Sequence, residues 1–354
     1  MNYKHLIDLN DFSQSEWASI IQLALKIADN PGEYYGSCHG KIMATLFYEP
    51  STRTQMSFQT AMLKLGGRII GFDNPQNSSV AKGESLKDTI VVVSGYADII
   101  AMRHPMEGSA KAASLYSNCP VINAGDGGHL HPTQTLTDLV TLSREKGRLS
   151  HLTVGLCGDL KNGRTVHSLI KALSQYEGNT FVLISTKELT IPPYVKEMLV
   201  QSHIPFTEVL SLEDAIPELD VLYMTRIQRE RFSSEEEYQQ QKDTYVLDPE
   251  KLSKAKSDLK ILHPLPRVDE IDYRVDDDTR AIYFKQTLYG VYARMALIMS
   301  MLGSFDPAPP LKGTPLEQKC SNPRCITSSE AYLPPSYKEH EGALFCEYCE
   351  QRQG

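Results

Sequence analysis

Short apolar runs alternate along the chain with longer stretches in which apolar residues recur every three or four positions. The short runs predict β-strands, and the longer periodic stretches predict amphipathic helices. Strands that alternate with helices are typical of a parallel sheet with helices on its faces. The predicted strands lie near residues 42–48, 68–72, 98–102 and 120–123 in the first half of the chain, and near 152–158, 180–185, 205–209, 220–225 and 260–263 in the second half.

This alternation restarts once, which predicts two domains of the same kind. A long amphipathic helix is predicted from Thr133 to about Glu145, and a new series of strands follows it. Another helical run, 287–302, is expected to return to the first domain. We therefore predict an α/β fold with two doubly wound parallel-sheet domains. The expected parts are residues 1–133 with 287–303, residues 134–286, a Pro-rich linker at 304–315, and a small C-terminal module at 316–354.

Length and charge narrow the class of protein. The 354 residues exceed one typical domain, and 41% hydrophobic and 23% charged residues are ordinary globular values. A net charge of −8 argues against a general nucleic-acid or membrane surface, so an anionic ligand must be attracted by local Arg and Lys clusters. No apolar run approaches the roughly 20 residues of a membrane span, and Asp8 and Asp11 interrupt any signal-peptide core. We expect a cytoplasmic protein.

The run Pro50-Ser-Thr-Arg-Thr54 has the chemistry of a phosphate site. It stands between the predicted strand at 42–48 and an apolar helical stretch from Met56 to Leu65. The unpaired N–H groups and the dipole of a helix N-terminus already favour an anion, and hydroxyl groups add further donors. The Arg53 fork can bind two phosphate oxygens. The alternative is an ordinary helix cap, because Ser and Thr begin many helices that bind nothing.

Cationic and histidine side chains follow several of the predicted strands. Parallel sheets bind ligands at the carboxyl ends of their strands, so these positions are candidate site residues. Taken singly, an Arg at a strand end is usually a solvated charge, and a His is usually a structural donor. Together, five such residues in both halves favour an anionic ligand: Arg103, His131, Arg164, Arg226 and His263.

Four of the seven cysteines crowd into the C-terminal module. Cys320 and Cys325 are separated by four residues, Cys346 and Cys349 by two, and the two pairs by twenty. Such pairs can supply the four thiolates of a closed tetrahedral zinc site, and so small a module needs metal or disulfides to fold. The alternative, a pair of disulfides or free thiols, is disfavoured because a reducing cytoplasm opposes disulfides. A catalytic zinc is disfavoured because four cysteines leave no open coordination position.

Seven motifs follow one another along the chain: Ser51-Thr-Arg-Thr54, Ser79 with Lys82-Gly-Glu84, Arg103-His-Pro105, His131-Pro-Thr-Gln134, Gly163-Arg-Thr165, Met224-Thr-Arg-Ile-Gln228 and His263-Pro-Leu-Pro-Arg267. In this order they resemble the catalytic chains of the aspartate carbamoyltransferase family, over roughly residues 4–303. The sister family, the ornithine carbamoyltransferases, shares the phosphate-binding run but has a His-Cys-Leu-Pro type of motif in place of the last one. Two arginines in the second half also suit an amino acid with two carboxylates better than one with a cationic side chain.

The resemblance implies transfer of the carbamoyl group of carbamoyl phosphate to the α-amino group of L-aspartate, in pyrimidine biosynthesis and without an organic cofactor. Carbamoyl phosphate is expected on the first domain and aspartate on the second. The Leu265-Pro266 peptide is expected to be cis, as in the family. The resemblance implies that the phosphate is bound by Ser51, Thr52, Arg53, Thr54 and Ser79, and the carbonyl oxygen by Thr54, Arg103 and His131. It implies that the carbamoyl NH2 is bound by Gln134, and that N–H groups of both reactants are bound by the main-chain oxygens of Pro264 and Leu265. It further implies that the aspartate carboxylates are bound by Arg164, Arg226 and Gln228, with Lys82 between the two substrates.

The resemblance also implies a homotrimer with active sites shared between neighbouring chains. In the family, the Ser and Lys of the loop at 73–83 come from the next chain, and here they correspond to Ser79 and Lys82. Ser78 is an alternative to Ser79, because the spacing between the serine and the lysine varies among relatives. Gln55 and Gln59 depart from an Arg and a Glu that are common in the family; replacing both keeps the pair neutral, so we expect little effect on catalysis.

The C-terminal module resembles the zinc-binding module of the regulatory chain that partners the aspartate enzyme in some organisms, over about residues 316–352. This implies one structural zinc per chain, bound by Cys320, Cys325, Cys346 and Cys349, and a role in stabilising the trimer or linking trimers. The nucleotide-binding portion of that regulatory chain has no counterpart in this sequence.

Two other functions stay open at this point. One is an inert transferase-like scaffold whose zinc module recruits a partner, and the other is a carbamoyltransferase for another amino acid such as ornithine. The complete set of anion-binding residues favours an active aspartate enzyme. We expect no nucleic-acid or membrane partner.

Overall fold

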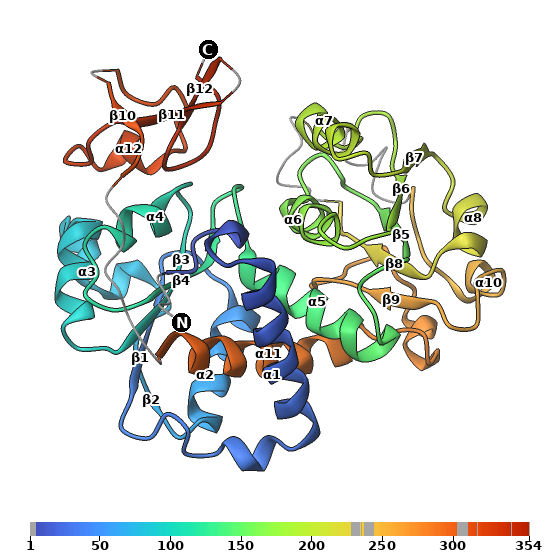
Figure 1. The fold of residues 1–354 in the computed structure, drawn as a ribbon, viewed down its shortest axis with the longest axis horizontal. Helices are drawn as coiled ribbons and strands as arrows, with labels where there is room; N and C mark the ends of the chain where they lie inside the picture. Colours follow the sequence, from blue (N-terminus) through green and yellow to red (C-terminus); the bar gives the residue numbers. More distant parts are fainter. Residues whose placement is uncertain are drawn as a thin grey trace. The chain divides into compact units, whose positions relative to one another are not determined.

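The computed structural model describes residues 5–227, 234, 236, 244–302, 311–316, 318–340 and 342–353. The chain forms two compact units, Met1–Thr133 with Val291–Gly354, and Gln134–Gly290. Each unit contains one parallel β-sheet with helices around it, and the first unit also includes a small C-terminal module (Figure 1). No helix in this described part of the chain is long and apolar enough to cross a lipid bilayer.

The sheet of the first unit has the strand order β2-β1-β3-β4. Strands β1, β3 and β4 are almost entirely buried, as a sheet covered on both faces requires. The winding reverses between β1 and β3, because β2 lies on one side of β1 and the two later strands lie on the other. The elements are β1 (Ile42–Phe47), β2 (Arg68–Phe72), β3 (Ile99–His104), β4 (Val121–Asp126), α1 (Gln14–Asp29), α2 (Thr52–Lys64), α3 (Leu86–Ser94), α4 (Ser109–Ser114), and the 3-10 turns η1 (Leu9–Asp11), η2 (Pro31–Tyr34), η3 (Pro75–Asn77) and η4 (Ser79–Lys82).

The second unit also has a parallel sheet, with five strands in the order β7-β6-β5-β8-β9. Its winding reverses between β5 and β8. A buried apolar cluster on one side of this sheet includes Leu222, Met224 and Ile261. The elements are β5 (Thr153–Cys157), β6 (Thr180–Ile184), β7 (Phe206–Val209), β8 (Val221–Met224), β9 (Lys260–Leu262), α6 (Arg164–Leu173), α7 (Pro193–Gln201), α8 (Leu212–Ala215), α10 (Pro249–Leu252), η5 (Ile216–Glu218) and η7 (Tyr273–Asp277).

Two long helices carry the chain from one unit to the other. Helix α5 is Pro132–Lys146, close to the predicted bounds, and proline suits its first position because that residue needs no N–H partner. Helix α11 is Tyr283–Leu302, so it begins earlier than the predicted residue 287. The Gln286 N–H already donates to the Ile282 carbonyl oxygen, at 2.8 Å, so the helical turns start before the apolar run that signals them. The predicted fold class, two doubly wound α/β domains, is confirmed.

The C-terminal module is a small antiparallel sheet, β10-β11-β12, with one short helix. Its elements are β10 (Thr314–Pro315), α12 (Ile326–Ser329), β11 (Ser336–His340) and β12 (Ala343–Cys346). Most of the predicted linker, residues 304–310, lies outside the described residues.

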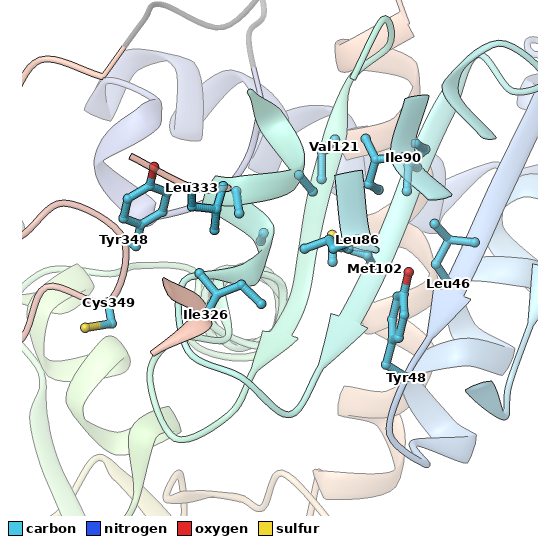
Figure 2. Close-up of a cluster of buried hydrophobic side chains, with 14 of the residues drawn as sticks. Leu46, Tyr48, Leu86, Ile90, Met102, Val121, Ile326, Leu333, Tyr348 and Cys349 are labelled. Atoms are coloured by element: carbon cyan, nitrogen blue, oxygen red, sulfur yellow. The ribbon is translucent and has the colours of Figure 1, made fainter. Parts of the chain in front are cut away.

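The module packs on the first unit through a shared apolar core. Ile326, Leu333 and Tyr348 of the module belong to the same buried cluster as Leu86 and Ile90 of α3 (Figure 2). Because these side chains are removed from water only when the module is docked, the apolar area that they bury stabilises the docked arrangement.

Glu107 and Gly108, just before α4, anchor the module through their backbones. The Glu107 N–H donates to the Arg324 carbonyl oxygen at 2.8 Å, and the Glu107 carbonyl oxygen accepts from the Ile326 N–H at 2.9 Å. Gly108 has φ +82°, and a Cβ atom there would lie 2.6 Å from the carbonyl carbon of Tyr348. Only glycine tolerates both the left-handed conformation and this close approach.

Candidate active site and metal centre

The N-terminus of α2 lacks an ordinary side-chain cap. Ser51 is its N-cap residue, but the Ser51 side chain makes no capping hydrogen bond and instead donates to Thr54 Oγ1 at 3.0 Å. The first N–H groups of the helix therefore lack the partner that an ordinary cap supplies. Thr52 and Arg53 are exposed beside them, and Arg53 makes no ion pair or hydrogen bond with any described residue. This geometry favours the phosphate-site interpretation over the ordinary cap.

Arg103 lies next to this helix start because β1 and β3 are neighbouring strands. Phe47 of β1 pairs with Arg103 of β3, and the Tyr48 N–H donates to the Arg103 carbonyl oxygen at 2.8 Å. The guanidinium is 13% exposed and forms an ion pair with Glu49 at 2.7 Å. Its Nε is buried and has no hydrogen-bond partner among the described residues. The sheet thus brings the Ser51-Thr-Arg-Thr54 run and Arg103 to the point where the winding reverses, where such sheets bind ligands.

Glu49 is a further candidate site residue that the sequence analysis did not single out. Its carboxylate holds the Arg103 guanidinium beside the carboxyl ends of β1 and β3. The signal in the sequence was a carboxylate immediately before Pro50, but its partner could be identified only once β1 and β3 were known to be neighbours.

The chain has three His-Pro motifs, and two of them use the imidazole to close a turn. Nδ1 of His104 accepts from the Met106 N–H at 3.0 Å, and Nδ1 of His263 accepts from the Leu265 N–H at 2.7 Å. Burial lowers the pKa of His104 to about 4, so this imidazole is neutral at physiological pH. His131, in contrast, directly precedes α5, is buried, and has Nδ1 3.5 Å from Thr133 Oγ1.

The loop that leads to His131 is tied to the C-terminal module. Nδ1 of His129 lies 3.1 Å from Asp126 Oδ2, and Nε2 of His129 lies 3.5 Å from Glu350 Oε2. Burial alone would lower the pKa of His129, but the two carboxylates outweigh it and raise that pKa well above its ordinary value. The Asp126 carboxylate also accepts from the N–H groups of Gly108 and Leu130. The module therefore contacts the loop two residues before His131.

In the second unit, Arg164 and Arg226 follow the two strands at which the winding reverses. Arg164 begins α6 after β5, and Arg226 comes two residues after the end of β8. Gly158 allows the two strand ends to approach, because it has φ +118° and a Cβ atom there would lie 2.4 Å from the Thr225 carbonyl oxygen. Both arginines are half-buried. Gln228, the other predicted carboxylate ligand, lies outside the described residues.

The turn after β9 has an unusual backbone conformation. The Leu265-Pro266 peptide is cis, which confirms the expectation, and Leu265 has φ +54°, in the left-handed region that a leucine rarely occupies. The His263 imidazole stabilises this turn through Nδ1, while its Nε2 lies 2.8 Å from Glu270 Oε1. Burial would raise the pKa of Glu270, but the hydrogen bond with His263 outweighs this and lowers it. A constrained turn of this kind holds the Pro264 and Leu265 carbonyl groups in fixed directions.

Arg267, the last residue of the same motif, has a structural role. Its guanidinium forms an ion pair with Asp276 and donates to the Tyr283 hydroxyl at 3.0 Å. Gln134 lies in the first turn of α5, half-buried, and donates to Asp138 Oδ1 at 2.8 Å.

In the loop after β2, Ser78 and Ser79 differ in their hydrogen bonds and exposure. The Ser78 hydroxyl caps η4, because it accepts from the Val80 N–H at 3.3 Å and donates to the Pro75 carbonyl oxygen at 2.8 Å. Ser79 is exposed and its hydroxyl makes no hydrogen bond with the described residues. Lys82 is likewise exposed, and no described carboxylate pairs with it. This difference favours Ser79 as the serine that faces a ligand.

The four module cysteines form one cluster. Their sulfur atoms all lie within 4.8 Å of one another, with 3.7 Å between Cys320 and Cys349 and 3.9 Å between Cys325 and Cys346. A tetrahedral zinc with Zn–S bonds of about 2.3 Å places its sulfurs about 3.8 Å apart. A disulfide would require about 2.05 Å. The cluster therefore fits a four-coordinate metal centre and excludes the disulfide alternative in this structure.

Several donors around the cluster suit thiolates. The Asn322 N–H and the Gln353 side chain lie 3.4 Å from Cys320 Sγ, and the Thr327 hydroxyl lies 3.2 Å from Cys325 Sγ. Such hydrogen bonds orient metal-bound sulfurs and stabilise their negative charge. The Asn322 side chain also donates to Glu107 Oε2 at 2.7 Å, which connects the cysteine cluster with the segment just before α4.

Family comparisons agree with the two-unit architecture. Residues 4–144 match the carbamoyl-P binding domain of aspartate/ornithine carbamoyltransferases, and residues 150–301 match the Asp/Orn binding domain of the same enzymes. The chain belongs to the aspartate/ornithine carbamoyltransferase family. Both matched segments end before the C-terminal module.

Individual relatives agree on the aspartate branch of this family. The aspartate carbamoyltransferase catalytic subunit of Clostridium novyi is 62% identical over 300 residues, which cover 85% of this chain and 98% of the relative. The catalytic subunit of M. jannaschii aspartate transcarbamoylase has a TM-score of 0.80 at 50% identity, over 84% of this chain and 98% of the other. Aspartate transcarbamoylase from Trypanosoma cruzi, in complex with carbamoyl phosphate and aspartate, has a TM-score of 0.80 at 36% identity, over 85% of this chain and 98% of the other.

Proposed function

We propose that this chain is the catalytic chain of an aspartate carbamoyltransferase. It transfers the carbamoyl group of carbamoyl phosphate to the α-amino group of L-aspartate and forms N-carbamoyl-L-aspartate and phosphate, a step of pyrimidine biosynthesis. One observation supports the proposal: hydroxyl and cationic side chains follow the strands at which each sheet reverses its winding, in a chain about 60% identical to aspartate carbamoyltransferases. The three cysteines outside the module, Cys38, Cys119 and Cys157, are buried free thiols, which supports a reducing cytoplasm.

The first unit binds carbamoyl phosphate. Its phosphate lies against the N-terminus of α2, where backbone N–H groups, the Ser51, Thr52 and Thr54 hydroxyls and the Arg53 guanidinium donate to the oxygens. Ser79 adds a further donor. Thr54, Arg103 and His131 donate to the carbonyl oxygen, which gains negative charge as the nitrogen attacks. Glu49 supports this function because it holds the Arg103 guanidinium in place before the substrate arrives.

The second unit binds aspartate. Arg164, Arg226 and Gln228 receive the two carboxylates, and Lys82 lies between the substrates. Gln134 accepts from the carbamoyl NH2 group, and the main-chain oxygens of Pro264 and Leu265 accept from N–H groups of both reactants. These oxygens orient the nucleophile without changing its protonation state.

The chemistry then requires no covalent enzyme intermediate. The lone pair of the aspartate α-amino group forms the new C–N bond at the carbamoyl carbon. The C–O bond to the phosphate breaks, the electron pair leaves with the phosphate, and the departing phosphate takes the proton of the amine. The protein contributes charge neutralisation and orientation to this step.

Selectivity for aspartate over ornithine is the direct test of this function. We expect kcat/KM for L-aspartate to exceed that for L-ornithine at least about 1000-fold, because a cationic side chain offers the arginines of the second unit no carboxylate and is repelled by them. Purified chain is supplied with carbamoyl phosphate and each amino acid, and the carbamoylated products are quantified. A preference for ornithine, or no carbamoyl transfer to either amino acid, contradicts the proposal.

The second proposed feature is a homotrimer with shared active sites. It is supported by the exposure of Ser79 and Lys82, which have no partner among the described residues. Chains that carry Arg53→Ala and chains that carry Lys82→Ala, each nearly inactive alone, should regain up to about a quarter of wild-type activity after mixing and reassembly, because that fraction of interfaces in a randomly mixed ring combines two intact halves. Each variant reassembled with itself is the control. No recovery, despite subunit exchange verified by mass spectrometry, would mean that each chain builds its own site.

The third proposed feature is one structural zinc per chain, held by Cys320, Cys325, Cys346 and Cys349. The sulfur separations and the surrounding donors support a closed tetrahedral site. Zinc there supplies folding free energy to the module and no reaction chemistry. The docked module in turn covers the apolar face of α3 and α4, so its role is to stabilise the first unit and the trimer or to link trimers.

A further inference from the structure

A buried carboxylate, Asp138, stands behind Gln134 in the second unit and has no role in the proposed reaction. It is fully buried in α5, four residues after Gln134, so the two side chains lie on the same face of the helix. Burial of a carboxylate is costly unless donors surround it. Packing alone therefore does not explain a carboxylate at this position.

Three neutral donors converge on the two oxygens of Asp138. Gln134 Nε2 lies 2.8 Å and Gln286 Nε2 lies 2.7 Å from Oδ1, and the Tyr223 hydroxyl lies 3.1 Å from Oδ2. Burial, followed by the negative charge of Asp138, raises the pKa of Tyr223 well above its ordinary value, so this hydroxyl keeps its proton and donates. The donors come from α5, α11 and β8, all within the second unit.

This environment fixes which end of the Gln134 amide faces outward. A carboxylate can only accept, so the amide atom next to Asp138 must be the NH2 group. The carbonyl oxygen Oε1 then faces away from Asp138, and it has no hydrogen-bond partner among the described residues. A carbamoyl NH2 group needs an acceptor, and the opposite amide orientation would present it with a second NH2 group.

The same carboxylate is connected to the turn at His263. The Gln286 amide is fixed at both ends, because Nε2 donates to Asp138 and Oε1 accepts from the His263 N–H at 3.0 Å. His263 in turn accepts from the Leu265 N–H. Asp138 thus contacts the Gln134 amide directly and is connected to the Pro264-Leu265 turn through Gln286 and His263. The proposed function assigns both of these groups to the carbamoyl NH2.

We propose that Asp138 is a positioning residue for carbamoyl transfer, which orients the Gln134 amide so that its carbonyl oxygen accepts from the carbamoyl NH2 group and which anchors the His263 turn through Gln286. This inference rests on the proposed function. Asp138 does not touch either substrate and acts only through its neighbours.

Removing the charge should misorient Gln134. In Asp138→Asn, an amide NH2 can face Gln134, which then turns its own carbonyl inward and its NH2 group toward the substrate. We expect kcat to fall about 10-fold or more, as for the loss of a buried hydrogen bond to a charged group. Asp220→Asn is the matched control, because Asp220 accepts from the Thr153 N–H and pairs with Lys256 at the amino end of β8. It should cost stability and leave kcat unchanged.

Exchanging the amide and the carboxylate between positions 134 and 138 distinguishes an effect on the orientation of the position-134 side chain from general structural damage. In the single variant Gln134→Glu, two carboxylates face each other and share a proton, so the pKa of the pair is raised. The protonated Glu donates to Asp138 and turns its carbonyl outward, as Gln134 does, so activity should be present below that raised pKa and lost above it. In the double variant Gln134→Glu with Asp138→Asn, the new amide donates to the new carboxylate. The double variant should regain activity over Asp138→Asn and lose the added pH dependence.

The measurements are kcat, KM for carbamoyl phosphate, and the pH profile of kcat for the folded, assembled enzyme, with thermal melting as the check on folding. Rescue by the double variant and the added pH dependence of Gln134→Glu support the proposal. The proposal is overturned if Asp138→Asn keeps the wild-type kcat. It is also overturned if Asp138→Asn lowers kcat by the same factor in the wild-type enzyme and in the Gln134→Ala variant. If Asp138→Asn does not fold, the pH profile of Gln134→Glu alone decides. A wild-type chain without carbamoyl transfer would instead refute the proposed function.

Discussion

Arg53→Ala is expected to lower kcat at least about 100-fold, the loss typical of removing one donor that stabilises developing charge. Arg53 stands at the open N-terminus of α2, exposed and without a partner in the described part of the chain. Its fork is therefore available to the phosphate, whose negative charge increases as the C–O bond breaks. The nearby Arg103 guanidinium is already paired with Glu49, so it should not compensate for the loss.

Steady-state kinetics of the purified variant provide the measurement. Lys64→Ala is the matched control, because it removes a cation from the other end of the same helix and should leave kcat unchanged. A guanidinium salt added to the Arg53→Ala reaction should restore part of the activity if the missing group acts directly on the leaving phosphate. Near-wild-type turnover in Arg53→Ala would refute the assignment of this helix start as the phosphate site.

Loss of the metal is expected to unfold the C-terminal module while most of the chemistry survives. Structural zinc contributes on the order of 10 kcal/mol to the folding of small modules, so Cys346→Ser or a strong chelator should abolish the local structure. Zinc content should fall from one ion per chain to none. The thermal melting temperature should also fall, because undocking exposes the apolar face that Ile326, Leu333 and Tyr348 cover.

Metal analysis by mass spectrometry, light scattering and the transferase assay are run on the same sample. Cys38→Ser is the control, because this thiol is buried outside the cluster and should not change the zinc content. The predicted groups that touch the substrates include no residue of the module, so assembly or stability should change before kcat does. Loss of catalysis in an intact, thermally unchanged assembly, or a folded module without metal, contradicts this account.

The local pattern of the sequence was sufficient for the fold class. Strand and helix periodicity depends on neighbouring residues, so the two sheets and the positions of most elements followed directly from it. The start of α11 was missed because Lys285 and Gln286 separate Tyr283 and Phe284 from the longer apolar run that signals the helix. Motifs at strand ends also indicated the candidate site residues, because parallel sheets bind ligands at that edge.

The remaining features depend on which distant strands become neighbours, and a single sequence does not reveal this. The Arg103–Glu49 ion pair exists because β3 lies beside β1, and the environment of Asp138 exists because α5, β8 and α11 meet. The docking of the module likewise joins residues separated by more than 200 positions, such as Glu107 and Asn322. The spacing of the cysteines predicted a metal centre but gave no information about the surface that the module covers.

The most direct test of the central claim is to follow the new bond itself. Purified chain is mixed with carbamoyl phosphate labelled with ¹³C at the carbonyl and with L-aspartate labelled with ¹⁵N at the α-amino group, and the product is observed by NMR. We predict a carbonyl ¹³C signal split by the directly bonded ¹⁵N, together with release of one phosphate per coupled product. Phosphate release without this coupling, or no reaction with aspartate while another amino acid becomes carbamoylated, would contradict the account.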